Sequence, residues 1–191
     1  MALDILRPGL PNAATELAPG RAALLCFILL PGGCALASFA FACATPFAAY
    51  AALAAAFLPL PSAFLVVAAA WIVNQAIGFG ALQYPHDANT VFWGLAIGAA
   101  ALAATASAGL LLRVLSRASQ LAALCAALLA AFVAYELVLF AFPPLLGGSG
   151  AFTFAILPRL GLLNVAWLVG LLAVCEAAIV LGRTRRRRLA A

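Results

Sequence analysis

Long apolar segments separated by short polar turns make up most of this chain. A helix needs about 20 residues to cross the hydrocarbon core of a membrane, and four segments reach that length. The pattern therefore predicts transmembrane helices over residues 62–82, 91–112, 118–142 and 160–182. The connection 143–159 is rich in Pro and Gly but still apolar, which is typical of a re-entrant or interfacial loop covered by protein or water.

The apolar run 22–58 is too long for one crossing and barely long enough for two. Pro31 and Pro46 interrupt it, and Thr45 before Pro46 is a typical helix start. One solution is a span over 22–43, kinked near Pro31, followed by a short helix over 46–58. The other is a single span over 34–58, kinked at Pro46. The total is therefore five spans or six.

Composition places the chain in a membrane. It is 68% hydrophobic and 8% charged, whereas soluble domains are about 45–50% apolar and about 25% charged. We therefore predict an all-α, polytopic membrane helix bundle of five or six transmembrane helices. Residues 1–20 form an N-terminal tail with no cleaved signal peptide, residues 21–182 form the bundle, and residues 183–191 form a basic tail.

The arginines predict an orientation. Five of them lie between Arg183 and Arg188, and Arg113 and Arg117 lie in a turn on the same side of the bundle. The opposite side has only Arg159 in its two connections, 83–90 and 143–159. All ten basic residues of this Ala-, Gly- and Pro-rich chain are Arg, a composition that indicates a bacterial protein. Because basic residues favour the cytoplasmic side, we expect it in the inner membrane with a cytoplasmic C-terminus. The same pattern makes the tail a topology signal that contacts membrane lipid, so no nucleic-acid partner is expected.

Polar residues gather in one half of the predicted bundle. Trp71, Asn74 and Gln75 lie from mid-membrane into the periplasmic half of their span, and Asn164 and Trp167 share a face of the last one. Aromatic rings with a few amides suit a pocket for a small, largely apolar solute. The alternative is that the amides tie helices together.

Glu136 is the strongest single candidate, because a carboxylate inside a span is costly unless paired or protonated. Its expected partners are His86, Arg159 or the amides of Asn74 and Gln75. Glu136 would bind a ligand amine or accept a proton. Together with the aromatic and amide residues above, it gives the predicted substrate-binding set: Trp71, Asn74, Gln75, Glu136, Asn164 and Trp167.

The loop 83–90 is predicted to cover that pocket through Tyr84, His86 and Asp87. His86 and Asp87 could form half a metal site, but a capping role for the polar turn is favoured because the next span begins just after it. The five Cys lie in apolar segments without a ligand pattern, so we expect no metal, disulfide or cofactor site. No catalytic motif is present, and an enzyme is not expected.

Gly94 and Gly98 form a GxxxG pair that Ala101, Thr105 and Ala108 continue. Such a stripe lets helix backbones approach closely. It predicts either an internal contact or a docking surface for another subunit.

Two functions follow as hypotheses. The first is binding or transport of a small, largely apolar solute through a pocket in the periplasmic half, together with a partner membrane subunit. The second is a non-catalytic accessory or assembly subunit of a larger membrane complex. A compact bundle of this kind is similar in architecture to the substrate-binding membrane subunits of energy-coupling vitamin transporters.

Overall fold

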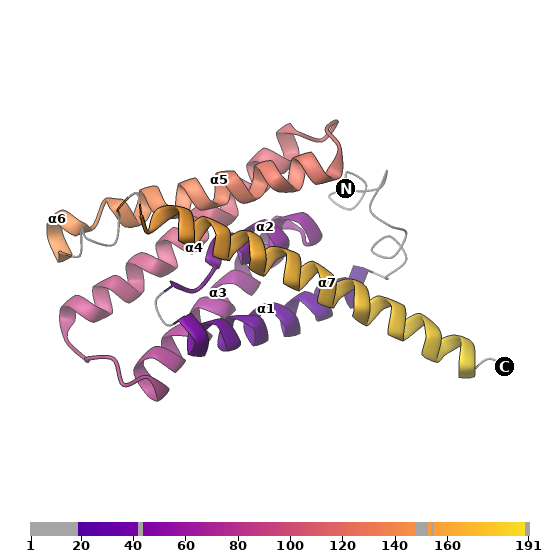
Figure 1. Cartoon of the computed structure of the whole chain (residues 1–191), viewed down its shortest axis with the longest axis horizontal. Helices are drawn as coiled ribbons and strands as arrows, with labels where there is room; N and C mark the ends of the chain where they lie inside the picture. Colours follow the sequence, from indigo (N-terminus) through magenta and orange to yellow (C-terminus); the bar gives the residue numbers. More distant parts are fainter. Residues whose placement is uncertain (1–18, 42–43, 148–152, 154, 190–191) are drawn as a thin grey trace.

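The described part of the chain folds into helices packed as one bundle (Figure 1). The computed structural model describes residues 19–41, 44–147, 153 and 155–189. Its elements are α1 (Pro19–Phe41), α2 (Phe47–Phe57), α3 (Leu60–Ala76) with the π-helix η2 (Ile77–Ala81), α4 (Ala88–Val114), α5 (Gln120–Phe140), α6 (Pro143–Leu146) and α7 (Leu157–Leu189).

Four helical segments are long and apolar enough to cross a membrane: Leu60–Ala81, Ala88–Val114, Gln120–Leu146 and Leu157–Cys175. They coincide with the four spans that the sequence predicts. Large aliphatic side chains project from their outer faces, among them Leu65 of α3, Leu110 of α4 and Leu162 of α7. The all-α membrane bundle is therefore confirmed, and the protein is a multi-pass membrane protein.

The segment 22–58 forms two helices rather than a single kinked span. α1 contains Pro31 and runs parallel to α3. Two hydrogen bonds show this direction: Cys34 Sγ donates to Ala70 O, and one turn further along both helices Asn74 Nδ2 donates to Ser38 Oγ. The chain then reverses, and α2 returns through the bundle. Of the two predicted arrangements, the structure has the long helix followed by the short one.

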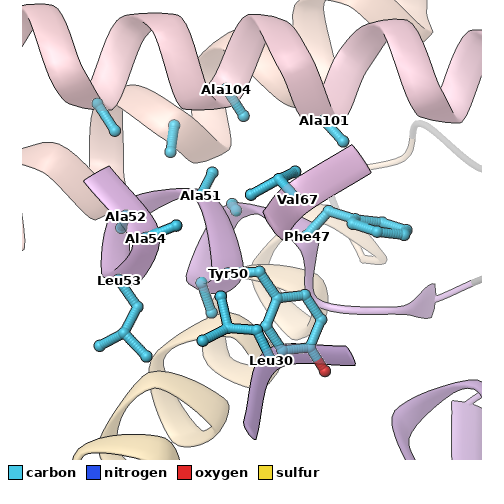
Figure 2. Close-up of a cluster of buried hydrophobic side chains, with 14 of the residues drawn as sticks. Leu30, Phe47, Tyr50, Ala51, Ala52, Leu53, Ala54, Val67, Ala101 and Ala104 are labelled. Carbon is cyan, nitrogen blue, oxygen red and sulfur yellow. The ribbon is translucent and has the colours of Figure 1, made fainter. Parts of the chain in front are cut away.

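α2 is the centre of the bundle. It contains 11 residues, or about 16 Å at 1.5 Å per residue, roughly half of a hydrocarbon core. Every residue from Phe47 to Ala54 is buried. Figure 2 shows Ala51 directed toward Ala101 and Ala104 of α4, with Tyr50 on the opposite side of α2. Alanines on both helices let their backbones approach closely.

Two turns define the ends of the bundle. The arginine end is marked by Arg113 in the last turn of α4 and Arg117 between α4 and α5. The histidine end is marked by His86 between η2 and α4. α2 runs from deep in the bundle toward the arginine end, where Leu58 is followed by Pro59. The basic segment predicted as a tail continues α7 as helix to Leu189. The predicted N-terminal tail lies, except for its last two residues, outside the described residues.

Candidate functional site

Asn74 is the hub of a buried polar cluster. Its Nδ2 donates to Ser38 Oγ of α1 at 2.8 Å and to Thr45 Oγ1 at 3.0 Å, just before α2. Its Oδ1 accepts a bond from Gln75 Nε2 at 3.0 Å. Ser38, Thr45 and Asn74 are all buried. Asn74 therefore links α1, the residues just before α2, and α3. Both N–H groups of its amide and its carbonyl oxygen are hydrogen-bonded.

Asn164 of α7 binds the start of α2 from another helix. Its Oδ1 accepts a hydrogen bond from the backbone N–H of Ala49 at 3.0 Å, and its Nδ2 donates to Leu160 O at 2.9 Å. The first N–H groups of a helix lack α-helical partners. The Ala49 N–H also donates to Pro46 O at 3.1 Å, so Asn164 supplies a second acceptor at the start of α2, as a capping side chain does. The sequence predicts that the helix starts at Thr45, but the N-cap residue of α2 is Pro46, one position later. Pro46 provides no side-chain hydrogen bond to the helix.

Trp71 and Gln75 face α4 instead. Trp71 Nε1 donates to the carbonyl of Gly94 at 2.9 Å. A Cβ atom built on Gly98 would lie 2.7 Å from Trp71 Cε2, and one on Gly94 would collide with the Gln75 amide. The GxxxG pair is therefore an internal contact between α3 and α4, which is one of the two predicted alternatives. Asn74 does not share this face, because it points toward α1.

The start of α2 brings together parts of the predicted site that are distant in sequence. Asn74 reaches it from α3 and Asn164 reaches it from α7. Phe47 in its first turn stacks on Tyr135 of α5, with ring centroids 6.1 Å apart. Among the described residues, Gln75 is linked to this region through its bond to Asn74, and Trp71 instead bonds Gly94 of α4.

A pair of polar atoms on α2 and α7 lies buried without a hydrogen bond. Tyr50 Oη and Trp167 Nε1 approach each other, but neither atom has a partner of hydrogen-bond geometry within the described chain. Gly33 of α1 lies beside them, since a Cβ atom there would be 3.8 Å from both Trp167 Nε1 and the Tyr50 ring. The Trp167 ring also packs edge-on against Phe41. Buried polar groups of this kind require an explanation, because more than about 90% of them are bonded in proteins.

Glu136 is half-buried on α5, one residue beyond Tyr135 and near the histidine end. None of its predicted partners bonds it, and within the described residues no hydrogen bond or ion pair reaches its carboxylate. Arg159 is exposed at the start of α7. Glu136 therefore stays a candidate for proton or amine binding without a structural partner. The sequence also suggests an ion pair between Glu176 and Arg183 close to the basic tail. The side chain of Glu176 lies outside the described residues.

The loop 83–90 packs on the helix ends next to it. The His86 ring stacks on Phe79 with centroids 5.4 Å apart, and the Tyr84 ring lies so close to Gly78 that a Cβ there would be 2.7 Å away. Asp87 is the N-cap of α4, where its Oδ1 accepts the Thr90 N–H at 2.7 Å. The capping role favoured over a metal site is confirmed for Asp87. In the described chain no group of three His, Cys, Asp or Glu residues could hold a metal ion.

Asp87 predicts a pH dependence. Its bond from the backbone of Thr90 lowers the pKa of the Asp87 carboxyl below its usual value of 3.8. A lowered pKa means that this contribution to stability is fully present above the usual value and is lost as the pH falls through the lowered one. We therefore expect the resistance of the bundle to SDS unfolding to fall below about pH 4.

Asp87→Asn is the matched control for this titration. Asparagine still caps a helix but does not ionise, so the acid-dependent difference between wild type and variant isolates Asp87 from Glu136. Parallel loss of stability in both proteins would show that another group titrates.

Sequence reasoning missed four residues of this region: Gly33, Ser38, Thr45 as a bonding partner, and Tyr50. Ser38 and Thr45 are small hydroxyl residues in the segment 22–58, for which the sequence allowed either one helix or two. Their position relative to Asn74 could therefore not be predicted. Tyr50 carries the clearest signal, because it has the only polar side chain in the sequence FAAYAALAAAF of α2.

Comparisons of the chain with models of protein families, with curated proteins and with solved structures found no match.

Proposed function

We propose that this protein binds, and helps to move, a small, largely apolar solute at the N-terminal end of α2. The observation that carries the proposal is the half-length helix itself, which begins deep inside the bundle beside Asn74 and Asn164. Interrupted or unusually short helices that begin near mid-membrane are typical of solute sites in transporters. The protein would act without catalysis, in a bacterial inner membrane, with its C-terminus in the cytoplasm and with a partner membrane subunit.

The unpartnered pair supports a site for a solute with one polar group. Trp167 Nε1 can only donate a hydrogen bond and Tyr50 Oη can donate one, so an acceptor oxygen would satisfy both. Phe41, Phe47 and Leu171 supply apolar surface nearby. α7 meets the bundle mainly through α2, so a small displacement of α7 would open this place to the membrane.

Extraction of the tagged protein in a mild detergent, followed by mass spectrometry of everything that co-purifies, tests this function. We expect a small molecule to accompany the wild-type protein. The double variant Tyr50→Phe/Trp167→Phe keeps the aromatic packing but removes both polar groups, so the amount of that molecule should fall by roughly tenfold or more, as expected for about 1.4 kcal/mol or more of lost binding.

Trp93→Phe is the matched control, because Trp93 lies half-buried near Phe142, away from this pair. It should retain the small molecule at the wild-type level. Absence of any small molecule from the wild-type preparation would contradict the proposal.

A second candidate is an accessory subunit of a larger membrane complex. The observation that favours it is the use of Trp71, Asn74, Gln75 and Asn164 in bonds between and along the protein's own helices. In that case the same preparation would contain a fixed set of membrane subunits and no solute.

A further inference from the structure

A cavity of about 70 Å³ lies at the arginine end, between the end of α2, the start of α3 and the turn from α4 to α5. Its walls are mainly apolar and include Leu60, Leu112 and Leu115, while Arg113, Ser116 and Gln120 line its polar side. Gly109 forms part of the wall, where a Cβ atom would come within 2.7 Å of Leu60 Cδ1. The cavity therefore places the guanidinium of Arg113 and the hydroxyl of Ser116 next to the apolar side chains of the helices.

Arg113 has no ion-pair partner in the described chain. The two carboxylates with described side chains, Asp87 and Glu136, belong to the histidine end of the bundle. Arg113 lies in the last turn of α4, at the level where a spanning helix leaves the hydrocarbon core. A guanidinium at that level, beside apolar walls, matches the phosphate of an amphiphile whose chains stay in the membrane.

We propose that this cavity is a specific site for the headgroup phosphate of an anionic phospholipid. Arg113 donates to the phosphate oxygens, Ser116 donates a further bond, and the leucines contact the upper part of the acyl chains. Free phosphate shares the same anion chemistry but would make no use of the apolar walls. The site is separate from the solute site at the start of α2 and does not depend on it.

Native mass spectrometry of the purified full-length protein tests the proposal, with phosphatidylglycerol and phosphatidylcholine of matched acyl chains as probes. We expect wild type to retain phosphatidylglycerol preferentially. Arg113→Gln should reduce the retained lipid by roughly tenfold, and Ser116→Ala by a smaller factor of about two to five.

Arg117→Gln is the matched control. Arg117 lies between α4 and α5 and, like Arg113, is exposed. It does not line the cavity, so lipid retention should change less than about twofold. An equal loss in Arg113→Gln and Arg117→Gln would show diffuse attraction to a basic surface and would overturn the proposal. Full displacement of the lipid by an equal concentration of inorganic phosphate would also overturn it, in favour of a site for free phosphate.

Discussion

Asn74→Leu is expected to lower the free energy of unfolding of the bundle by about 2–4 kcal/mol. The change removes three hydrogen bonds at 2.8–3.0 Å. Hydrogen bonds between membrane helices contribute about 0.6 kcal/mol on average and up to about 1.7 kcal/mol, and buried polar groups left without partners add a desolvation cost. SDS titration in mixed micelles measures this difference.

Asn89→Leu is the control for Asn74→Leu, since Asn89 is exposed in the first turn of α4 and its change should stay within about 0.5 kcal/mol. A stable Asn74→Leu protein would contradict the assignment of Asn74 as the tie among α1, α2 and α3. The amide would then be free to serve a solute.

Gly98→Ala is expected to lower the free energy of unfolding by about 2–3 kcal/mol. The new methyl group would lie 2.7–3.0 Å from three indole atoms of Trp71, and the indole is a rigid ring fixed by its bond to Gly94 O. Overpacking typically costs about 1–3 kcal/mol, and moving the ring would break a bond worth about another 1 kcal/mol. The better helix propensity of alanine offsets up to about 1 kcal/mol of this cost. The same SDS titration applies.

Gly170→Ala provides the matched control in α7, because nothing lies within 4 Å of a Cβ atom there. Alanine should leave stability unchanged or raise it by up to about 1 kcal/mol through its better helix propensity. The mechanism is checked by repeating Gly98→Ala in a Trp71→Ala background, where the added penalty should largely vanish. A penalty of the same size there would mean that the Gly98 contact is not with Trp71.

These stability tests also separate the two functional hypotheses. If Asn74 and Trp71 are structural ties, their variants are destabilised according to the hydrogen bonds and side-chain packing that each substitution removes. If Tyr50 and Trp167 form the solute site, replacing them with Phe removes the solute. The stability cost is then set by the smaller ring at position 167, since neither polar atom has a hydrogen-bond partner within the described chain. Stability and solute retention therefore report on different residues.

Hydrophobic periodicity alone determined the helical class, the four long spans and the polar turns, because a segment of about 20 apolar residues has few alternatives to a membrane helix. The capping role of Asp87 was also readable, since a cap is a local interaction within one turn. The placement of Asn74 and Asn164 in the same half of the bundle followed from span direction.

What those residues contact depends on how the helices pack. Asn74 and Gln75 are neighbours in sequence, yet one turns toward α1 and the other toward α4, because adjacent helical positions point about 100° apart. The packing of α2 among α1, α3, α4, α5 and α7 brings Thr45 to Asn74, Ala49 to Asn164 and Tyr50 to Trp167. Such pairings depend on how helices pack, and an Ala-rich sequence with nearly uniform hydrophobicity carries little information about which faces meet.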